Sequence, residues 1–466
     1  MSSPSISAAT GTRLSFREKF AYGLGDTASN FYFQLFNQFL FFYYNVVFGL
    51  PAKQVGTLML VTTILVALLN PVVGAIADRT TTRWGKFRPY ILWGAIPYGV
   101  LGYLMFANPH FGTEGKLIYA YVTYTLVLIT YAVINTPYSA LMGVISPSSE
   151  DRTSVSTYRF ACAFLGALLI GFLVPWLKDA LAGAGGDQAV GFRNTMTLFA
   201  ILSVAMFFYT FANTRERVSP PAAQKSSLGR DLKDLGGNVP WMILFFVAFL
   251  NLTNVGMRSG SAVYYFKYCI GDDHALSMFN LVGFICFIGG ALSTKFFLRF
   301  VARRELMIGL TVVNALTMGA FYFVDPHAMK TLYALNIIGQ FAAGPTPAIV
   351  WSLYADTADF GEWKFGRRAT GLIFSATVFA QKVGLAIGAA MIGWLLDKYG
   401  FVANATQTPR ALHGIAILFA ILPAIFGGLS GLAILFYRID EPTVKQIERE
   451  LAARKSEPPA PAAATT

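Results

Sequence analysis

The stretch LLNPVVGAIADRTTTRWGKFRPYILWG, residues 68–94, joins two apolar segments through a short basic loop. The first segment contains the pair Asn70-Pro71 among Val, Leu and Ala neighbours. A helix needs about 20 mainly apolar residues to cross a bilayer. Extending the two segments outward predicts one membrane helix over 54–77 and another over 89–107, with the basic loop at one membrane surface.

Composition extends this prediction to the whole chain. Of its 466 residues, 55% are hydrophobic and 13% are charged, whereas soluble domains carry about 25% charged residues. We therefore predict an all-α membrane protein with many spans. The net charge of +12 comes from short loops between apolar segments, so it indicates membrane topology rather than nucleic-acid binding.

Motifs for cofactor or metal chemistry are missing from the sequence. The three cysteines lie singly in apolar runs, and the four histidines are far apart. There is no GxxxxGK[ST] phosphate loop, HExxH zinc motif or GxSxG nucleophile elbow. We expect no cofactor, no metal site and no enzymatic activity.

Apolar segments predict twelve membrane helices in two halves of six. They cover 20–48, 54–77, 89–107, 117–146, 158–181, 193–213, 239–269, 276–300, 306–324, 330–355, 371–396 and 411–437. The predicted organisation is a leader (1–19), an N-terminal bundle (20–213), a linker (214–238), a C-terminal bundle (239–438) and a disordered tail (439–466). Most Lys and Arg residues fall in the leader, the linker, the tail and the loops on their side, so the positive-inside rule places both termini in the cytosol.

Polar side chains inside the spans point to a binding site. Such groups are costly in hydrocarbon, so they usually pair or line a polar cavity. Asp26 and Asn30 are four residues apart on one helix face, as are Tyr131 and Asn135. Three further candidates are cations within or at the end of spans, namely Arg159, Arg258 and Lys382.

Four sequence blocks together resemble one known family. They are FREKFAYGLGDTASNF (16–31), RWGKFRP (83–89), YYFKY (264–268) and the long block 354–384, which ends in SATVFAQKVG. In this order they resemble the glycoside–pentoside–hexuronide:cation symporters, in the melibiose permease-like branch of the major facilitator superfamily. The resemblance implies a major facilitator fold and uptake of a sugar or glycoside by alternating access, coupled to a cation.

The resemblance also assigns roles to positions of this chain. Tyr131, Arg159 and Lys382 match positions that bind or flank the sugar. Asn30, Asn70 and Asn135 stand where the melibiose permease carries aspartates that bind the sugar or the cation. The loop 79–88 matches a gate in the superfamily, for which we single out Asp78, Arg83, Lys86 and Arg88.

These observations define the expected function. The substrate is a sugar or glycoside, such as an oligosaccharide or hexuronide, bound by Asn30, Tyr131, Asn135, Arg159, Arg258 and Lys382. The expected coupling ion is a proton rather than Na⁺, with Asp26 and Asn70 as the candidate coupling positions. The expected location is the cytoplasmic (inner) membrane, in contact with lipid. The alternatives are a sodium-independent facilitator and a carrier of lysolipids or other amphiphiles with the same fold.

Overall fold

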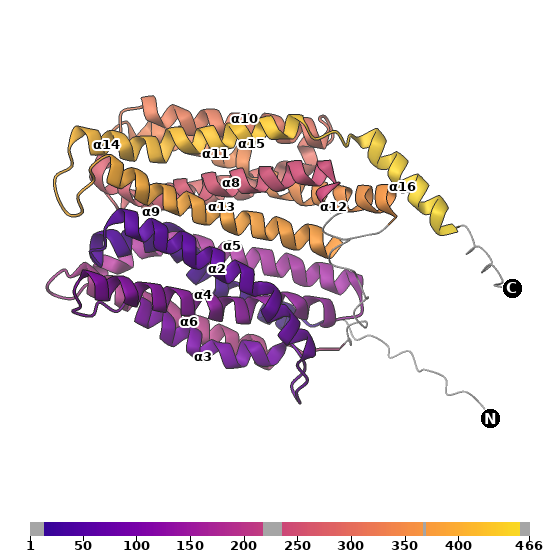
Figure 1. Ribbon diagram of the computed structural model, residues 1–466, viewed down its shortest axis with the longest axis horizontal. Coiled ribbons are helices and arrows are strands. Elements are labelled where there is room, and N and C mark those ends of the chain that lie inside the picture. The colour runs from indigo at the N-terminus through magenta and orange to yellow at the C-terminus, as the bar shows by residue number, and fades with distance from the viewer. Residues whose placement is uncertain (1–13, 218–234, 367–369, 457–466) are drawn as a thin grey trace. The chain divides into compact units, whose positions relative to one another are not determined.

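The computed structural model describes residues 14–217, 235–366 and 370–456, and all regular structure in these ranges is helical (Figure 1). The first group of helices is α1 (Phe16–Leu35) with its π-helical continuations η1 (Phe36–Leu40) and η2 (Tyr43–Val47), α2 (Ala52–Arg79), α3 (Arg88–Met105), α4 (Thr113–Val144), α5 (Ser149–Ala180) and α6 (Gln188–Asn213). The second is α8 (Val239–Tyr264) with η3 (Tyr265–Ile270), α9 (Ala275–Phe297), α10 (Arg303–Ala320) with η4 (Phe321–Phe323), α11 (Met329–Ala343), α12 (Thr346–Phe365), α13 (Thr370–Lys398), α14 (Pro409–Ala416), η5 (Ile417–Ile421), α15 (Leu422–Leu435) and α16 (Glu441–Ser456).

Each of the twelve predicted spans coincides with helical residues. Nine helices of the described ranges are long and apolar enough to cross a membrane. The predicted spans outside these nine are the polar α1, and α3 and α11, which have only 18 and 15 residues. The predicted span 330–355 is divided between α11 and α12 around Gly344 and Pro345.

Close helix crossing explains the glycine at this division. A Cβ atom on Gly344 would collide with the backbone of Phe287 and Ala291 in α9. Likewise, a Cβ on Gly290 would collide with the carbonyl of Phe341. Small residues let membrane helices approach at backbone distance, so α9 packs tightly against the junction of α11 and α12.

The chain forms two compact units. Unit 1 comprises 1–223, 273–280 and 403–405, and unit 2 comprises 224–272, 281–402 and 406–466. The first boundary lies inside the predicted linker 214–238. The two short segments of unit 1 were not anticipated, because the sequence around each of them belongs to the C-terminal half.

Reciprocal aromatic and polar contacts hold α1 inside unit 1. Tyr22 and Tyr138 stack with ring centroids 4.6 Å apart, and each hydroxyl donates to the other residue's backbone carbonyl. The Thr27 hydroxyl donates to the Cys162 carbonyl of α5 at 2.9 Å, and the Thr210 hydroxyl of α6 donates to an α1 carbonyl. In lipid, the hydrophobic effect does not drive helices together, so hydrogen bonds between helices stabilise their packing.

Unit 2 packs around α8. This helix lies against α13 and α15, and α10 lies against α15 and α11. Its buried core includes Leu244, Val247, Met307, Tyr354 and Tyr437, each at most 2% exposed.

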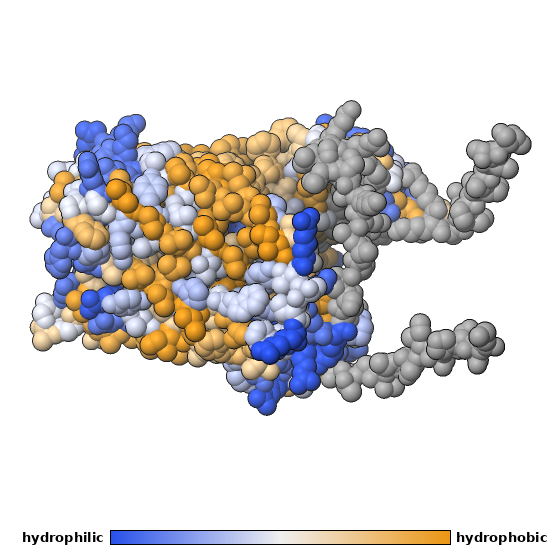
Figure 2. Space-filling model, turned by 60° about the horizontal axis from the view of Figure 1, so that its bottom comes forward, coloured by the Kyte–Doolittle hydropathy of each residue, from blue (hydrophilic) through white to orange (hydrophobic). Residues whose placement is uncertain are grey.

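Large apolar side chains remain on the outside of the helices. Leu68, Ile118, Ile201 and Leu292 are 63%, 65%, 64% and 79% exposed. The face in Figure 2 shows apolar side chains gathered over the helices and hydrophilic ones at the helix ends. A soluble monomer rarely exposes such a surface, so we assign it to contact with lipid.

The ends of the chain differ from prediction. The first helix begins at Phe16, inside the predicted leader 1–19, because the Ser15 hydroxyl accepts the Glu18 N–H at 3.2 Å. This Ser-x-x-Glu pattern is typical of a helix N-terminus. The predicted disorder of 439–466 is wrong for α16, in which Ile447 is 2% exposed and packing retains the helix. Residues 457–466 lie outside the described ranges.

Candidate functional site

An ion pair marks the place where α1, α4 and α5 meet in unit 1. The Arg159 Nε donates to Asp26 Oδ2 at 3.0 Å, and Arg159 Nη2 lies 3.5 Å from the Ser139 hydroxyl. The guanidinium also lies over the Tyr138 ring, 5.4 Å from its centroid. The side chains of Arg159 and Asp26 are 22% and 11% exposed, so the pair is only partly withdrawn from solvent.

This pairing determines what the two groups are able to do. Two charges taken out of water need each other, because an unpaired one is strongly destabilising. Arg159 has five N–H donors, and only some of them face Asp26 and Ser139. The remaining donors are available to an acceptor such as a sugar hydroxyl or a carboxylate.

Two amides predicted as site residues share one arrangement. Asn30 Nδ2 donates to the Asp26 carbonyl at 2.9 Å, and Asn135 Nδ2 donates to the Tyr131 carbonyl at 3.2 Å. Each NH₂ group is therefore anchored to its own helix, which sets the orientation of the amide oxygen. Asn30, Tyr131 and Asn135 are all half-buried. The structure thus brings Asn30 next to the ion pair and Asn135 next to Tyr131.

Asn70 has a backbone partner that explains the Asn-Pro pair. Proline lacks an N–H, so Pro71 leaves the carbonyl of residue 67 without its usual helical donor. Asn70 Nδ2 lies 3.4 Å from that Ala67 carbonyl and replaces the missing donor. The geometry therefore accounts for Asn70 as a helix-repairing residue, and its part in cation coupling stays a prediction.

The two cations predicted in unit 2 have different surroundings. Arg258 is 9% exposed, donates to the Phe419 carbonyl at 3.0 Å and lies between the Phe321 and Phe419 rings, 4.6 and 4.4 Å from their centroids. These contacts anchor Arg258 to η5. Lys382 is half-buried on α13 and makes no ion pair within the described part of unit 2. Its amino group is thus available to another partner.

The basic loop between α2 and α3 is held by an acid that sequence reasoning missed. The Glu216 carboxylate accepts the backbone N–H groups of Lys86, Phe87 and Arg88 at 2.8, 2.7 and 3.0 Å. Arg88 is the first residue of α3 and Phe87 is its N-cap, so the carboxylate lies at the N-terminus of this helix, where a negative charge is favoured. Glu216 was overlooked because it lies in the predicted linker, although a carboxylate next to Arg-rich sequence was a visible signal.

The other loop residues support the same arrangement. Arg88 Nη2 donates to the Phe211 carbonyl at 2.6 Å, and Arg83 lies 4.4 Å from the Trp84 ring centroid. Next to Glu216, Arg217 makes a bidentate ion pair with Glu18: Nη1 donates to Oε1 at 2.6 Å and Nη2 donates to Oε2 at 2.9 Å. The hydrogen bonds to Glu18 raise the pKa of Arg217 above its ordinary value. The side chain of Asp78 lies outside the described part of the structure, so its gate role stays a prediction.

Together, an all-helical fold, a lipid-facing surface and polar side chains within the spans are typical of a membrane transport protein. Residues 21–441 match the family model described as MFS/sugar transport protein, and the chain belongs to this family. The chain is 34% identical to a putative glycoside/cation symporter, YagG, of Escherichia coli (strain K12). The alignment covers 94% of this chain and 95% of the relative.

Two further relatives have names that specify a sugar. An isoprimeverose transporter of Lactiplantibacillus pentosus is 34% identical over 91% of this chain and 89% of its own. A glucuronide carrier protein homolog of E. coli (strain K12) is 30% identical over 95% and 97%. A solved D-xylose-proton symporter is similar in fold, with a TM-score of 0.65, 13% identity and coverage of 91% and 98%. These findings confirm the resemblance, the major facilitator fold and the expectation of a transporter rather than an enzyme.

Removing the Glu216 carboxylate should loosen the loop before α3. A hydrogen bond to a charged group contributes roughly 1.5–3 kcal/mol, so we expect E216A to destabilise unit 1 by at least about 1.5 kcal/mol. E216Q, which keeps a carbonyl acceptor, should lose less. The measurement is the thermal unfolding temperature of the purified protein in detergent. The matched control is E114A, at an exposed carboxylate in the first turn of α4; equal shifts for E114A and E216A would contradict the assignment.

Proposed function

We propose that the chain imports a sugar or glycoside through the inner membrane by alternating access and couples this uptake to protons. The observation that carries the proposal is the Asp26–Arg159 ion pair beside the anchored amide of Asn30. Amide groups suit sugar hydroxyls, because each hydroxyl both donates and accepts hydrogen bonds. The symporter relatives support a small-molecule substrate and a coupling cation.

The ion pair suggests how a proton and a substrate act together. While Asp26 is ionised, it holds the Arg159 guanidinium at 3.0 Å. A proton on Asp26 removes that charge and releases Arg159 toward the substrate. Binding of the substrate to Arg159 in turn favours the protonated form of Asp26. The two ligands therefore bind with positive cooperativity, which linkage requires to be reciprocal.

An acidic sugar fits this mechanism best. A carboxylate on the sugar replaces Asp26 as the partner of Arg159 and restores charge balance when Asp26 carries a proton. Lys382 supplies a second positive charge on unit 2, whereas Arg258 is already held by aromatic rings and a backbone carbonyl. We therefore propose a hexuronide or similar acidic glycoside over a neutral disaccharide.

Competition between an acidic and a neutral sugar tests the substrate class. A guanidinium–carboxylate contact is worth roughly 1.5–3 kcal/mol, so methyl β-D-glucuronide should bind the purified protein about tenfold or more tightly than isoprimeverose. The measurement is calorimetric or fluorescence titration with each sugar. R159M should remove the preference for the glucuronide. Tighter binding of isoprimeverose would refute the acidic class and leave a neutral glycoside as the substrate.

Substitution of Asp26 tests coupling. D26N cannot take up and release a proton, so in proteoliposomes it should abolish uptake driven by a pH gradient while preserving exchange of labelled for unlabelled sugar. The matched control is D397N, the same change at an exposed carboxylate in α13. Wild-type uptake should need no Na⁺. A sodium requirement, or gradient-driven uptake by D26N, would show that another group or ion couples transport.

We further propose that the end of unit 1 carrying the start of α1 faces the cytosol. The Leu14 N–H binds Asp151 at the start of α5, and Glu18 binds Arg217, so the basic segments gather at this end. A cysteine at the exposed Thr81 should react with an impermeant maleimide in inside-out vesicles and stay unlabelled in intact spheroplasts. The reverse pattern would invert the topology.

A further inference from the structure

One segment of the chain packs with helices that are distant in sequence. Residues 273–280, which we name the strap, follow η3 and include the first turns of α9. They belong to unit 1, although 224–272 before them and 281–402 after them belong to unit 2. The strap lies at the C-terminal end of α5, opposite the end where Leu14 binds Asp151.

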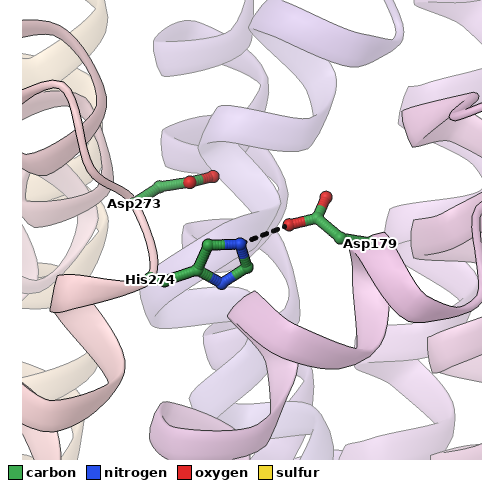
Figure 3. A group of neighbouring side chains, drawn as sticks. All are labelled: Asp179, Asp273 and His274. Carbon is green, nitrogen blue, oxygen red and sulfur yellow. Dashed lines mark ion pairs between the residues drawn. The ribbon is translucent and has the colours of Figure 1, made fainter.

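A buried lysine joins the strap to α5. Lys178 is 4% exposed, and its Nζ lies 2.9 Å from Asp179 Oδ2 and 2.8 Å from Asp273 Oδ2. Figure 3 shows Asp273 and His274 approaching Asp179 from a separate segment of the chain, with His274 Nε2 3.3 Å from Asp179 Oδ2. The His274 ring also packs on Trp176, with centroids 4.3 Å apart.

The other end of the strap is held by an amide. Asn280 Nδ2 lies 3.3 Å from Gln38 Oε1 and 3.2 Å from the Gly171 carbonyl. A Cβ atom on Gly171 would lie 3.4 Å from this amide, at van der Waals contact, so the strap lies directly against α5 here. Ion pairs therefore hold one end of the strap, and neutral hydrogen bonds hold the other.

The contacts fall on one face of the strap. His274, Ser277 and Asn280 are spaced by three residues, which places them on the same side of a helical turn. Ser277 lies between the two contacting residues and has no exposed surface. It is thus a natural reporter of whether the strap is seated.

The contacts of Lys178 favour an ionic cluster over a metal site. Asp179, Asp273 and His274 bring ligand atoms within 4.8 Å of one another, a donor set that would suit a divalent cation. However, the Lys178 ammonium already contacts both carboxylates at hydrogen-bond distance. The cluster therefore contains its own cation, and a metal ion would have to displace a buried, paired lysine.

We propose that the strap is a releasable ionic latch, with Lys178 as the counter-ion that keeps it seated on α5. Movement of the strap away from α5 separates Lys178 from Asp273 and Asn280 from Gln38. The second short segment of unit 1 is held by an amide, as the Asn280 end of the strap is, because Asn404 Nδ2 donates to the Val46 carbonyl of η2 at 2.8 Å. Release of the strap frees the C-terminal end of α5 from residues 273–280.

Thiol labelling tests the latch without knowledge of the substrate. In a background with Cys162, Cys269 and Cys286 replaced by alanine, S277C should react slowly with a maleimide. Adding K178M leaves two carboxylates facing each other, so labelling should accelerate about tenfold, which corresponds to about 1.4 kcal/mol of lost closure free energy. K178R, which keeps the positive charge, should stay slow. Unchanged labelling in K178M would overturn the proposal.

A matched reporter separates strap release from general unfolding. Thr253 in α8 also has no exposed surface, and T253C should label slowly with or without K178M. Equal acceleration at both positions would show that Lys178 stabilises the protein as a whole, which also overturns the latch.

Metal rescue gives an independent measurement. K178H adds an imidazole to the two carboxylates and His274, so Zn²⁺ should reseat the strap, slow the labelling of S277C and be reversed by EDTA. The double variant K178H/H274Q should respond much less to Zn²⁺. Failure of Zn²⁺ to slow labelling in K178H would mean that these side chains do not stay within coordinating distance, contrary to the latch.

Discussion

A polar group that the helices of this protein withdraw from water is stabilised when it finds a partner within the chain. The bilayer offers no replacement hydrogen bonds, so a missing donor or an unpaired charge is costly. Unit 1 shows this constraint at three scales. Asn70 supplies a donor to one backbone carbonyl, Glu216 supplies an acceptor to a whole helix start, and Asp26 supplies a charge to Arg159.

The same constraint is met differently in unit 2. Arg258 rests on two aromatic faces and on the Phe419 carbonyl, and the neighbouring Leu418 carbonyl accepts a hydrogen bond from Ser261. Both carbonyls belong to η5, a π-helical turn. Such turns are rare and frequently occur at functional sites. A cation stabilised in this way is fixed in place, whereas Arg159 is held by an acid whose charge a proton would neutralise.

In the proposed mechanism, this difference gives the two halves separate chemical tasks. In unit 1, a titratable carboxylate and a guanidinium form an ion pair. A proton on the carboxylate, or an acidic substrate on the guanidinium, would break this ion pair. In unit 2, the positive charges have no described acid of this kind at the predicted site. Coupling in the proposed mechanism is therefore a property of α1, α4 and α5. The strap, which contacts α5, is continuous in sequence with residues that belong to unit 2.

The sequence alone determined the class of fold, because the length and spacing of apolar segments depend only on local composition. It also marked Asp26, Asn30 and Arg159, since polar residues inside spans stand out against their neighbours. Only the tertiary structure decided which of these groups meet. The pairing of Asp26 with Arg159, the capping of α3 by Glu216 and the seating of residues 273–280 on Lys178 join positions about 95 to 133 residues apart, and hydropathy carries no information about contacts at that separation. The helix α16 was missed for a related reason: its sequence is polar, and its helical state depends on packing of Ile447 that only the folded chain provides.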